Sequence, residues 1–149
     1  MISQTAEYAL RAMTCLAGEY NKPLTTQQIA DAAHIPVGYL YKVLQSLGRA
    51  GLVQSTRGLH GGYVLSLPPE DISILRVVQA VDPIQRIKVC PLNLKSHSTR
   101  LCPLHRRLDE AAAMVEHAFA QTTLAELLHP GPGAFPRPLC DCGHSGKKK

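Results

Sequence analysis

The sequence predicts a mainly α-helical protein: a winged helix-turn-helix domain with a small two-stranded wing, followed by a long C-terminal helix. Three observations support this prediction. Two helical patterns, residues 25–33 and 37–50, are separated by a three-residue turn. A glycine-rich loop, residues 57–62, lies between two short alternating stretches. Apolar residues then recur at a heptad-like spacing through residues 103–120.

The boundaries of the two short helices have recognisable local chemistry. Thr25 followed by Gln28 is the spacing of a capping box, in which each side chain accepts from the other residue's backbone N–H. Pro36 suits a first helical turn, where its missing N–H costs nothing. Gly51 stands where a helix commonly ends in a left-handed residue. These signals predict a helix-turn-helix.

The second helix of this pair has two different faces. One is an apolar stripe, and the other is neutral to basic with no carboxylate, so it can enter a DNA major groove without repelling phosphates. An ordinary solvated outer face is the alternative interpretation. The candidate DNA-contacting residues of the helix pair are Thr26, Pro36, Gly38, Tyr39, Tyr41, Lys42 and Gln45.

The predicted wing joins strands at residues 52–55 and 63–66. Its loop adds Arg57, Gly58 and His60 to the candidate DNA-contacting residues. Glycines permit close backbone approach to phosphates, and Arg57 is suited to a narrow minor groove, where negative potential is concentrated. A plain hairpin with a flexible tip is the alternative. Because the helix pair and the basic wing agree, together they favour double-stranded DNA as the partner.

Composition narrows the class of protein. The chain has 149 residues, 45% of them hydrophobic, and a net charge of +5, which suits a globular protein with an anionic partner. No apolar run reaches the ~20 residues of a membrane span, and no signal peptide is apparent, so we expect a cytoplasmic location and no membrane partner. There is no nucleotide-cradling loop or recognisable nucleophile setting, which argues against an enzyme.

The chain divides into three regions. Residues 1–67 form the winged helix-turn-helix head, and its first helix, from Ser3 to about Tyr20, also lies near the predicted dimer interface. Residues 68–129 comprise a connector helix capped by Ser73, a cysteine-containing loop, the long helix and a short closing helix that begins with a Thr123–Glu126 capping box. Residues 130–149, rich in Pro, Gly and Lys, are predicted to be a disordered tail.

The long helix is predicted to be a dimerisation helix. Its apolar residues step by four, three, four and three: Leu104, Leu108, Ala111, Val115 and Ala118. Its outer face has mixed charge: Arg106, Arg107, Asp109, Glu110 and Glu116. Two reading heads on one duplex require a two-fold axis, so we expect a homodimer and a pseudo-palindromic DNA operator.

Residues 84–101 show neither helical nor strand periodicity, and long loops of this kind are often functional. Cys90 lies within this stretch, and Cys102 and His105 follow it. Thiolates and imidazoles suit iron–sulfur centres and zinc, but unliganded thiols forming a disulfide switch remain open. Cys15 is expected in the core. The tail residues Cys140, Cys142 and His144 form an incomplete site and are interpreted as an adventitious metal binder.

Four segments resemble the Rrf2 (Rrf-two) family of bacterial winged helix-turn-helix transcription regulators: EYALRAM (residues 7–13), the helix-turn-helix ending in GLV (51–53), RGLHGGYVL (57–65) and VVQAVD (77–82). The resemblance covers about residues 1–129. It implies a homodimeric regulator whose long C-terminal helices cross. It also implies, as in many members, an iron–sulfur cluster in the loop before the dimer helix, whose state changes DNA affinity.

The sequence departs from the family at the cluster. The family pattern has three cysteines six residues apart, sometimes followed by a histidine; here the middle position is Ser96, a poor ligand for a soft metal. Glu7 stands at the position of a ligand that rarer members supply from the partner's first helix. The resemblance thus implies a [2Fe–2S] cluster bound by Cys90, Cys102, His105 and Glu7, with His97 as a substitute.

Two further hypotheses compete with the cluster-controlled regulator. One is a cofactor-free or zinc-bound regulator that uses Cys90 and Cys102 as a thiol switch. The other, more remote, is a metal- or thiol-handling scaffold that never binds DNA. Lys42 and Arg57 discriminate between regulator and scaffold, because only a regulator needs them for duplex binding.

Overall fold

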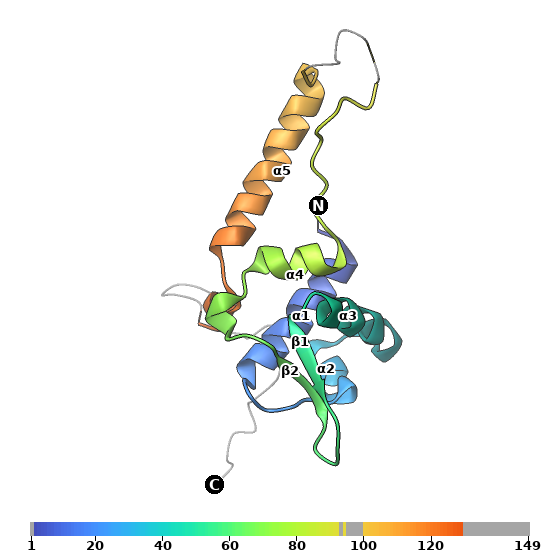
Figure 1. Ribbon diagram of the computed structural model, residues 1–149, viewed down its shortest axis with the longest axis vertical. Helices are drawn as coiled ribbons and strands as arrows, with labels where there is room; N and C mark the ends of the chain where they lie inside the picture. Colours follow the sequence, from blue (N-terminus) through green and yellow to red (C-terminus); the bar gives the residue numbers. More distant parts are fainter. Residues whose placement is uncertain (1, 93, 95–99, 130–149) are drawn as a thin grey trace.

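The computed structural model describes residues 2–92, 94 and 100–129, so the predictions for Ser96, His97 and the tail after residue 129 lie outside the described residues. A globular head is built around α1 (Gln4–Gly18), and α5 (Pro103–Gln121) projects from it as a stalk (Figure 1). The segment that follows α4 runs alongside α5. No helix among the described residues is both long and apolar enough to cross a membrane.

Helix α1 is the centre of the head. Ser3 caps it by accepting a hydrogen bond from the backbone N–H of Ala6 at 3.2 Å, as predicted. The helix ends at Gly18, two residues before the predicted end, and Asn21 then turns the chain with φ 65°. One long face is buried against α2, α3, α4 and α6. Cys15 lies on this face, fully buried, which confirms its assignment to the core.

The helix-turn-helix consists of α2 (Thr26–Ala33) and α3 (Val37–Arg49). Both halves of the predicted capping box are present between Thr25 and Gln28. His34 makes the turn in the left-handed region, with φ 53°. Pro36 precedes α3 as its N-cap residue, one position earlier than the predicted first turn. Gly51 has φ 71°, so the predicted glycine stop is confirmed.

The wing pairs β1 (Val53–Thr56) with β2 (Gly62–Leu65) in antiparallel register, Val53 opposite Leu65. Each strand is shifted by one residue from its predicted bounds. Leu24 also joins the edge of β2, exchanging backbone hydrogen bonds of 2.8 and 3.0 Å with Tyr63. A Cβ added at Gly62 would lie 2.5 Å from the Leu24 carbonyl oxygen, so only glycine permits this close approach.

After the wing, η1 (Pro69–Asp71) leads into α4 (Ile74–Val81), which Ser73 caps as predicted. After the C-terminal end of α5, α6 (Leu124–Leu128) begins with the predicted Thr123 capping box. The chain returns to the head there, because the N–H of Leu124 donates to the Ile72 carbonyl at 2.9 Å. Leu124 is fully buried. One end of α5 is therefore anchored to the head, and the other is remote from it (Figure 1).

Candidate functional site

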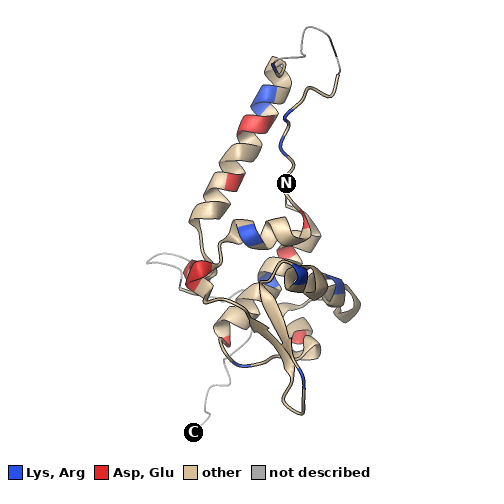
Figure 2. Cartoon of the chain, viewed as in Figure 1, with Lys and Arg blue, Asp and Glu red and all other residues tan. Residues whose placement is uncertain are grey.

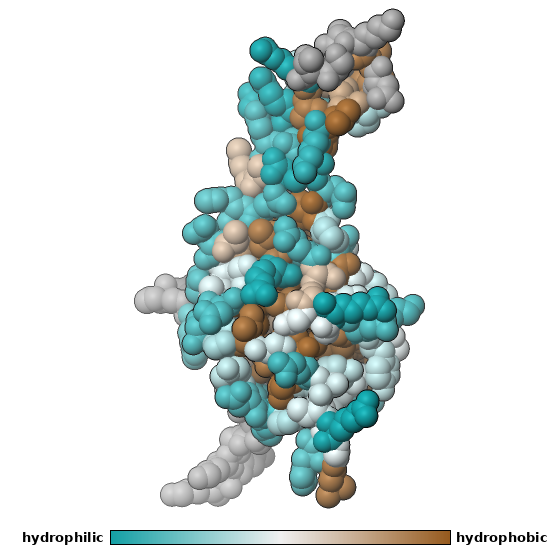
Figure 3. Space-filling model, in the orientation of Figure 1, coloured by the Kyte–Doolittle hydropathy of each residue, from teal (hydrophilic) through white to brown (hydrophobic). Residues whose placement is uncertain are grey.

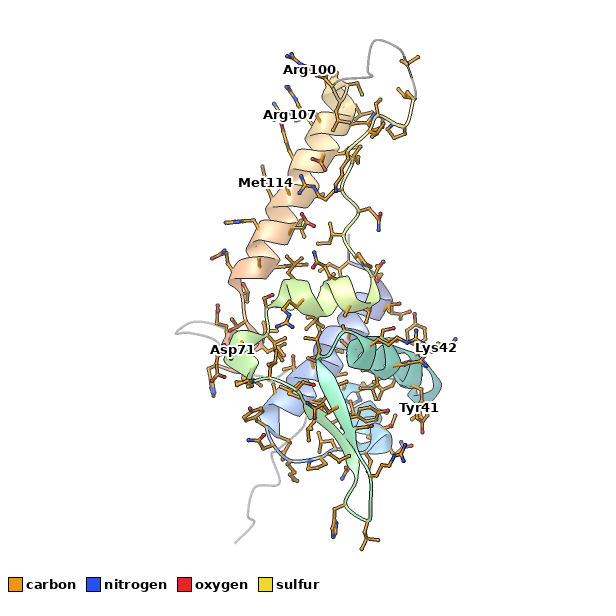
Figure 4. The ribbon with its side chains drawn as sticks, viewed as in Figure 1. Tyr41, Lys42, Asp71, Arg100, Arg107 and Met114 are labelled. Carbon is orange, nitrogen blue, oxygen red and sulfur yellow. The ribbon has the colours of Figure 1, made fainter. Side chains whose placement is uncertain are left out.

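The surface of α3 combines a buried stripe with a reading face. Leu40, Val43, Leu44 and Leu47 are all buried, as predicted, and hold the helix on α1 and α4. Tyr41 is 57% exposed, and Lys42 and Gln45 are also exposed. Figure 4 shows Tyr41 and Lys42 together at the outer end of α3, away from the head's core. Figure 2 shows cations and no carboxylate on this helix. The face therefore suits phosphate and base contact.

A groove of about 560 Å³ separates α3 from the wing. Tyr41, Lys42 and Gln45 line it from the helix, and Ser55 and Tyr63 line it from the strands. The structure thus brings three of the predicted DNA-contacting residues beside the wing. Ser55 and Tyr63 were missed by the sequence analysis, because pairing of the strands with α3 is a long-range contact that no local pattern encodes.

Tyr39 differs from the other residues predicted to contact DNA. Its hydroxyl lies 2.6 Å from Thr5 Oγ1 on α1. Its ring packs edge-on against Tyr8, with centroids 5.4 Å apart, and the Arg11 guanidinium lies over the Tyr8 ring. These contacts fix the start of α3 on α1. They give Tyr39 a structural role beside its predicted place in the DNA interface.

The wing tip carries the remaining predicted residues on an open surface. Arg57, Gly58 and His60 are all exposed. Gly58 has φ 118°, a conformation that L side chains rarely adopt. Leu59 is 96% exposed at the tip, a feature that the sequence analysis did not consider. Thr26 is half-buried, while Pro36 and Gly38 are exposed on the same end of the helix pair as Tyr41.

At the remote end of α5, Cys90, Cys102 and His105 come together. Their ligand atoms all lie within 4.8 Å of one another. His105 Nδ1 lies 3.0 Å from Cys102 Sγ and 3.6 Å from Cys90 Sγ. Cys90 is 2% exposed, and the other two are partly exposed. Two sulfur donors and one imidazole in this space provide three of the four ligands that zinc or an iron–sulfur centre uses.

Local sequence explains the placement of two of the three residues in this cluster. Cys102 is the N-cap residue of α5 and Pro103 is its first residue, so His105 stands in the first turn, three residues after Cys102. That spacing places the two side chains next to each other. Cys90 comes from the irregular segment that runs beside α5, fifteen residues earlier in the chain. Only the tertiary structure brings it to His105.

Arg86 binds that segment to α5. Its guanidinium donates two parallel hydrogen bonds to Asp109, at 2.7 and 2.8 Å, and a third to Glu116 at 2.8 Å. Asp109 also accepts from the Ile87 N–H at 2.9 Å. The guanidinium and that N–H hold the pKa of Asp109 at about 2 and the carboxylates raise that of Arg86. Asp109 and Glu116, predicted on a mixed-charge outer face, instead hold the neighbouring segment, because local periodicity cannot reveal what packs on a helix.

Glu7 lies apart from this cluster within one chain. Among the described residues, the group of close metal-ligating side chains contains only the two cysteines and His105. Glu7 is exposed on α1 and forms an ion pair with Arg11, one turn later. Within one chain, Glu7 is therefore not brought together with Cys90 and Cys102.

A second groove, of about 390 Å³, opens between α5 and the head. Apolar side chains from three helices and from the residue Ile2 before α1 line most of it: Ile2, Ala6, Val78, Leu108, Ala111, Ala112, Val115 and Phe119. Three members of the predicted helix seam, Leu108, Ala111 and Val115, thus face a shared hollow with the start of α1 and with α4. Figure 3 shows hydrophobic surface where the stalk meets the head.

Comparison with known proteins decides the family. A family model described as "Rrf2: Iron-dependent Transcriptional regulator" matches residues 2–130. The chain belongs to the Rrf2 family. The resemblance inferred from the wing and the first helix is thereby confirmed, and so is the winged helix-turn-helix fold. An Rrf2 protein is a DNA-binding transcriptional regulator and not an enzyme.

Individual Rrf2 relatives agree over most of their length. The HTH-type transcriptional regulator NsrR of Shouchella clausii is 30% identical over 131 residues, which cover 85% of this chain and 87% of NsrR. The IscR structure from T. potens superposes with a TM-score of 0.71 at 25% identity, covering 86% of this chain and 85% of its own. CymR, the global cysteine regulator of B. subtilis, gives 0.70 at 27% identity, covering 85% and 95%.

Proposed function

We propose that this Rrf2 regulator acts as a homodimer on a pseudo-palindromic operator, and that an iron–sulfur cluster, or the redox state of the same site, controls its DNA affinity. The observation that supports the control step is the gathering of Cys90, Cys102 and His105 within 4.8 Å at the start of α5. That helix is also the proposed dimer element. A change at the site is therefore in a position to alter how two heads are spaced.

In the proposed DNA complex, α3 lies in the major groove and the wing lies along the minor groove. Lys42 reaches a guanine edge or a phosphate, and Tyr41 packs against a thymine methyl. Arg57 enters the minor groove. The groove between α3 and the wing leaves room for the sugar–phosphate backbone between these two contacts. One head reads one half-site, so two-fold symmetry in the dimer requires two-fold symmetry in the operator.

The proposed dimer buries the apolar side of α5. Leu104 and Leu108 are 63% and 51% exposed in the single chain, and no residue of α5 is buried. A helix of this length with no buried side chain gains little stability from its own subunit. Figure 3 shows further hydrophobic surface at the far end of the stalk. Packing against a second α5 removes this surface from water.

The donor set of the cluster site fits an iron–sulfur centre in part. Cys90 and Cys102 offer thiolates and His105 offers an imidazole, all types that ligate such clusters. Glu7 of a second subunit is the proposed fourth ligand. When bound, a cluster supplies a centre that responds to oxidants and to small reactive gases. The protein's own part is to hold the two sulfurs and the imidazole together at the start of α5.

The deciding experiment is a visible absorption spectrum of protein purified without oxygen, with iron, sulfide and zinc measured on the same sample. Bands between roughly 320 and 600 nm with matched iron and sulfide are expected. Cys102→Ser should remove them, whereas the matched variant Cys140→Ser/Cys142→Ser should keep them. A colourless, iron-free protein would exclude the cluster and leave DNA binding untouched. Zinc alone would assign the site to zinc.

The thiol switch is a second candidate, favoured by the proximity of the two sulfurs. Cys90 Sγ and Cys102 Sγ lie no more than 4.8 Å apart, so a small movement suffices to bring them to bonding distance. In that case the oxidised and reduced forms differ in DNA affinity without any metal. Mass spectrometry of protein treated with diamide or with dithiothreitol distinguishes this switch from a cluster.

A further inference from the structure

The segment that carries Cys90 to the cluster has little regular structure of its own. Residues 82–90 contain no helix or strand. Lys88 and Val89, the residues next to Cys90, are exposed, so they do not anchor it. Yet Cys90 itself is 2% exposed and lies 3.6 Å from His105 Nδ1. Some other contact must fix the course of this segment along α5.

The contacts of Arg86 have the geometry of such an anchor. The planar guanidinium makes a fork-to-fork pair with Asp109 and a further bond to Glu116, which fixes the direction of the side chain as well as its distance. The Ile87 N–H donates to the same carboxylate, so the backbone next to Arg86 is also fixed. An exposed single ion pair contributes little, but three charge-assisted bonds and a backbone bond act as one network.

The Arg86 network and the cluster join the same segment to the same face of α5. Asp109 follows His105 by four residues, so both project from the same face of α5. Arg86 precedes Cys90 by four residues in the segment that runs antiparallel to the helix. Arg86 on Asp109 and Cys90 on His105 are thus two successive contacts of one segment with one helix face.

We propose that Arg86, with Asp109 and Glu116, is the positioning element of the cluster site: it holds the segment so that Cys90 meets Cys102 and His105 before any metal binds. The three residues touch no metal themselves. The inference rests on the proposed function in one respect, namely that Cys90 is a ligand. Its direct consequence, the placement of the Cys90 thiol, does not depend on that function.

The first experiment measures metal affinity with Co²⁺ as the probe, followed by its thiolate absorption in reduced, full-length protein. Arg86→Gln should weaken binding by about 10-fold, the lower limit for residues that orient metal ligands. Asp109→Ala should weaken it similarly. These two variants remove opposite charges, so a purely electrostatic effect would move their affinities in opposite directions. Such opposite shifts, or affinities within about two-fold of wild type, would overturn the proposal.

The control variant is Arg107→Gln. Arg107 carries the same charge, lies two residues from His105 and pairs with Glu110 at 2.9 Å. In Figure 4 it points from the side of α5 away from the Cys90 segment. Its loss should leave Co²⁺ affinity unchanged. Circular dichroism and gel filtration verify that all three variants keep their helix content and assembly state.

The second experiment needs no metal. In the apo protein, the rate of maleimide addition to each cysteine is followed by mass spectrometry. Arg86→Gln should speed modification of Cys90 several-fold, because the released segment exposes its thiol, while Cys15 in the head core stays protected. Equal Cys90 rates in wild type, Arg86→Gln and Arg107→Gln would overturn the proposal. If wild type binds neither Co²⁺ nor iron but Cys90 still responds, the sensing function fails and the positioning role stands.

Discussion

The head and the stalk of this protein are held by different forces. In the head, α1 to α4 bury a continuous set of aliphatic side chains, including Met13, Leu16, Leu44 and Leu47. Helix α5 buries none of its residues, and Arg86 of the neighbouring segment is held to it by hydrogen-bonded ion pairs. The head therefore buries its apolar side chains within one chain. The apolar side chains of the stalk stay exposed in one chain, so a second chain can bury them, as expected of a dimer helix.

The largest expected effect comes from the head core. Leu47→Ala should lower the free energy of unfolding by about 2–5 kcal/mol, because the cavity lies among rigid, buried neighbours. Met114→Ala on the stalk, a side chain 71% exposed, should cost far less in the monomer. Urea denaturation of both variants measures the difference. Similar losses for the two would mean that head and stalk do not differ in this way.

A substitution in the stalk should instead affect formation of the dimer. Leu108→Glu places a charge in the apolar groove between α5 and the head, where pairing in a dimer would bury it. We expect monomers in sedimentation velocity at micromolar concentration, with a folded head by circular dichroism. Arg107→Glu, an exposed change on the same helix, is the control. A dimer that persists with Leu108→Glu would place the interface elsewhere.

A single added methyl group should destabilise the wing. Gly62→Ala puts a Cβ within 2.5 Å of the Leu24 carbonyl, so the bridge from Leu24 to β2 must open, at a cost of about 1–3 kcal/mol. Gly38→Ala, where a Cβ meets nothing within 4 Å, should be neutral or slightly stabilising in its helix. Thermal unfolding separates the two. A Gly62→Ala protein as stable as wild type would show that the bridge is dispensable.

The reading face should be detectable in the salt dependence of DNA binding. Lys42→Ala or Arg57→Ala, if each cation neutralises one phosphate, makes the slope of log K against log salt shallower by roughly one unit. Fluorescence anisotropy with a duplex of genomic promoter DNA measures it. Arg107→Ala, at the remote end of α5, removes the same charge and should leave the slope unchanged. Unchanged slopes in Lys42→Ala and Arg57→Ala would exclude these two cations as phosphate contacts, and a wild-type protein that binds no duplex would favour the scaffold hypothesis.

The smallest expected effect is the loss of stability at low pH that follows from the lowered pKa of Asp109. The pKa of Asp109 lies at about 2 in the folded protein, below the roughly 3.9 of an unfolded aspartate. A lowered folded pKa means that the stabilisation is fully present above pH 4 and is lost as pH falls through about 2. Carboxyl ¹³C NMR of Asp109 should therefore show no titration at pH 4. Arg86→Gln should return its pKa toward the ordinary value; an unchanged pKa would exclude Arg86 as the main cause.

Local sequence patterns predicted much of the fold because the contacts that produce them join residues close together in the chain. Capping boxes at Thr25 and Thr123, the glycine stop at Gly51 and the spacing of Cys102 with His105 each depend on residues within one turn. The periodic apolar stripe of α3 likewise appeared buried as predicted. The strands of the wing were displaced by one residue, since short strands take their register from their partners.

What the sequence determined by itself was therefore the elements, the caps of several helices and the family that the wing and first helix indicate. The tertiary structure alone decided that Tyr39 packs on Tyr8, that Leu24 bridges to Tyr63 and that Asp109 holds Arg86 instead of facing solvent. These contacts join residues far apart in the chain. An irregular segment has no period that fixes which face it presents, so its partners are settled only when it packs against a folded helix.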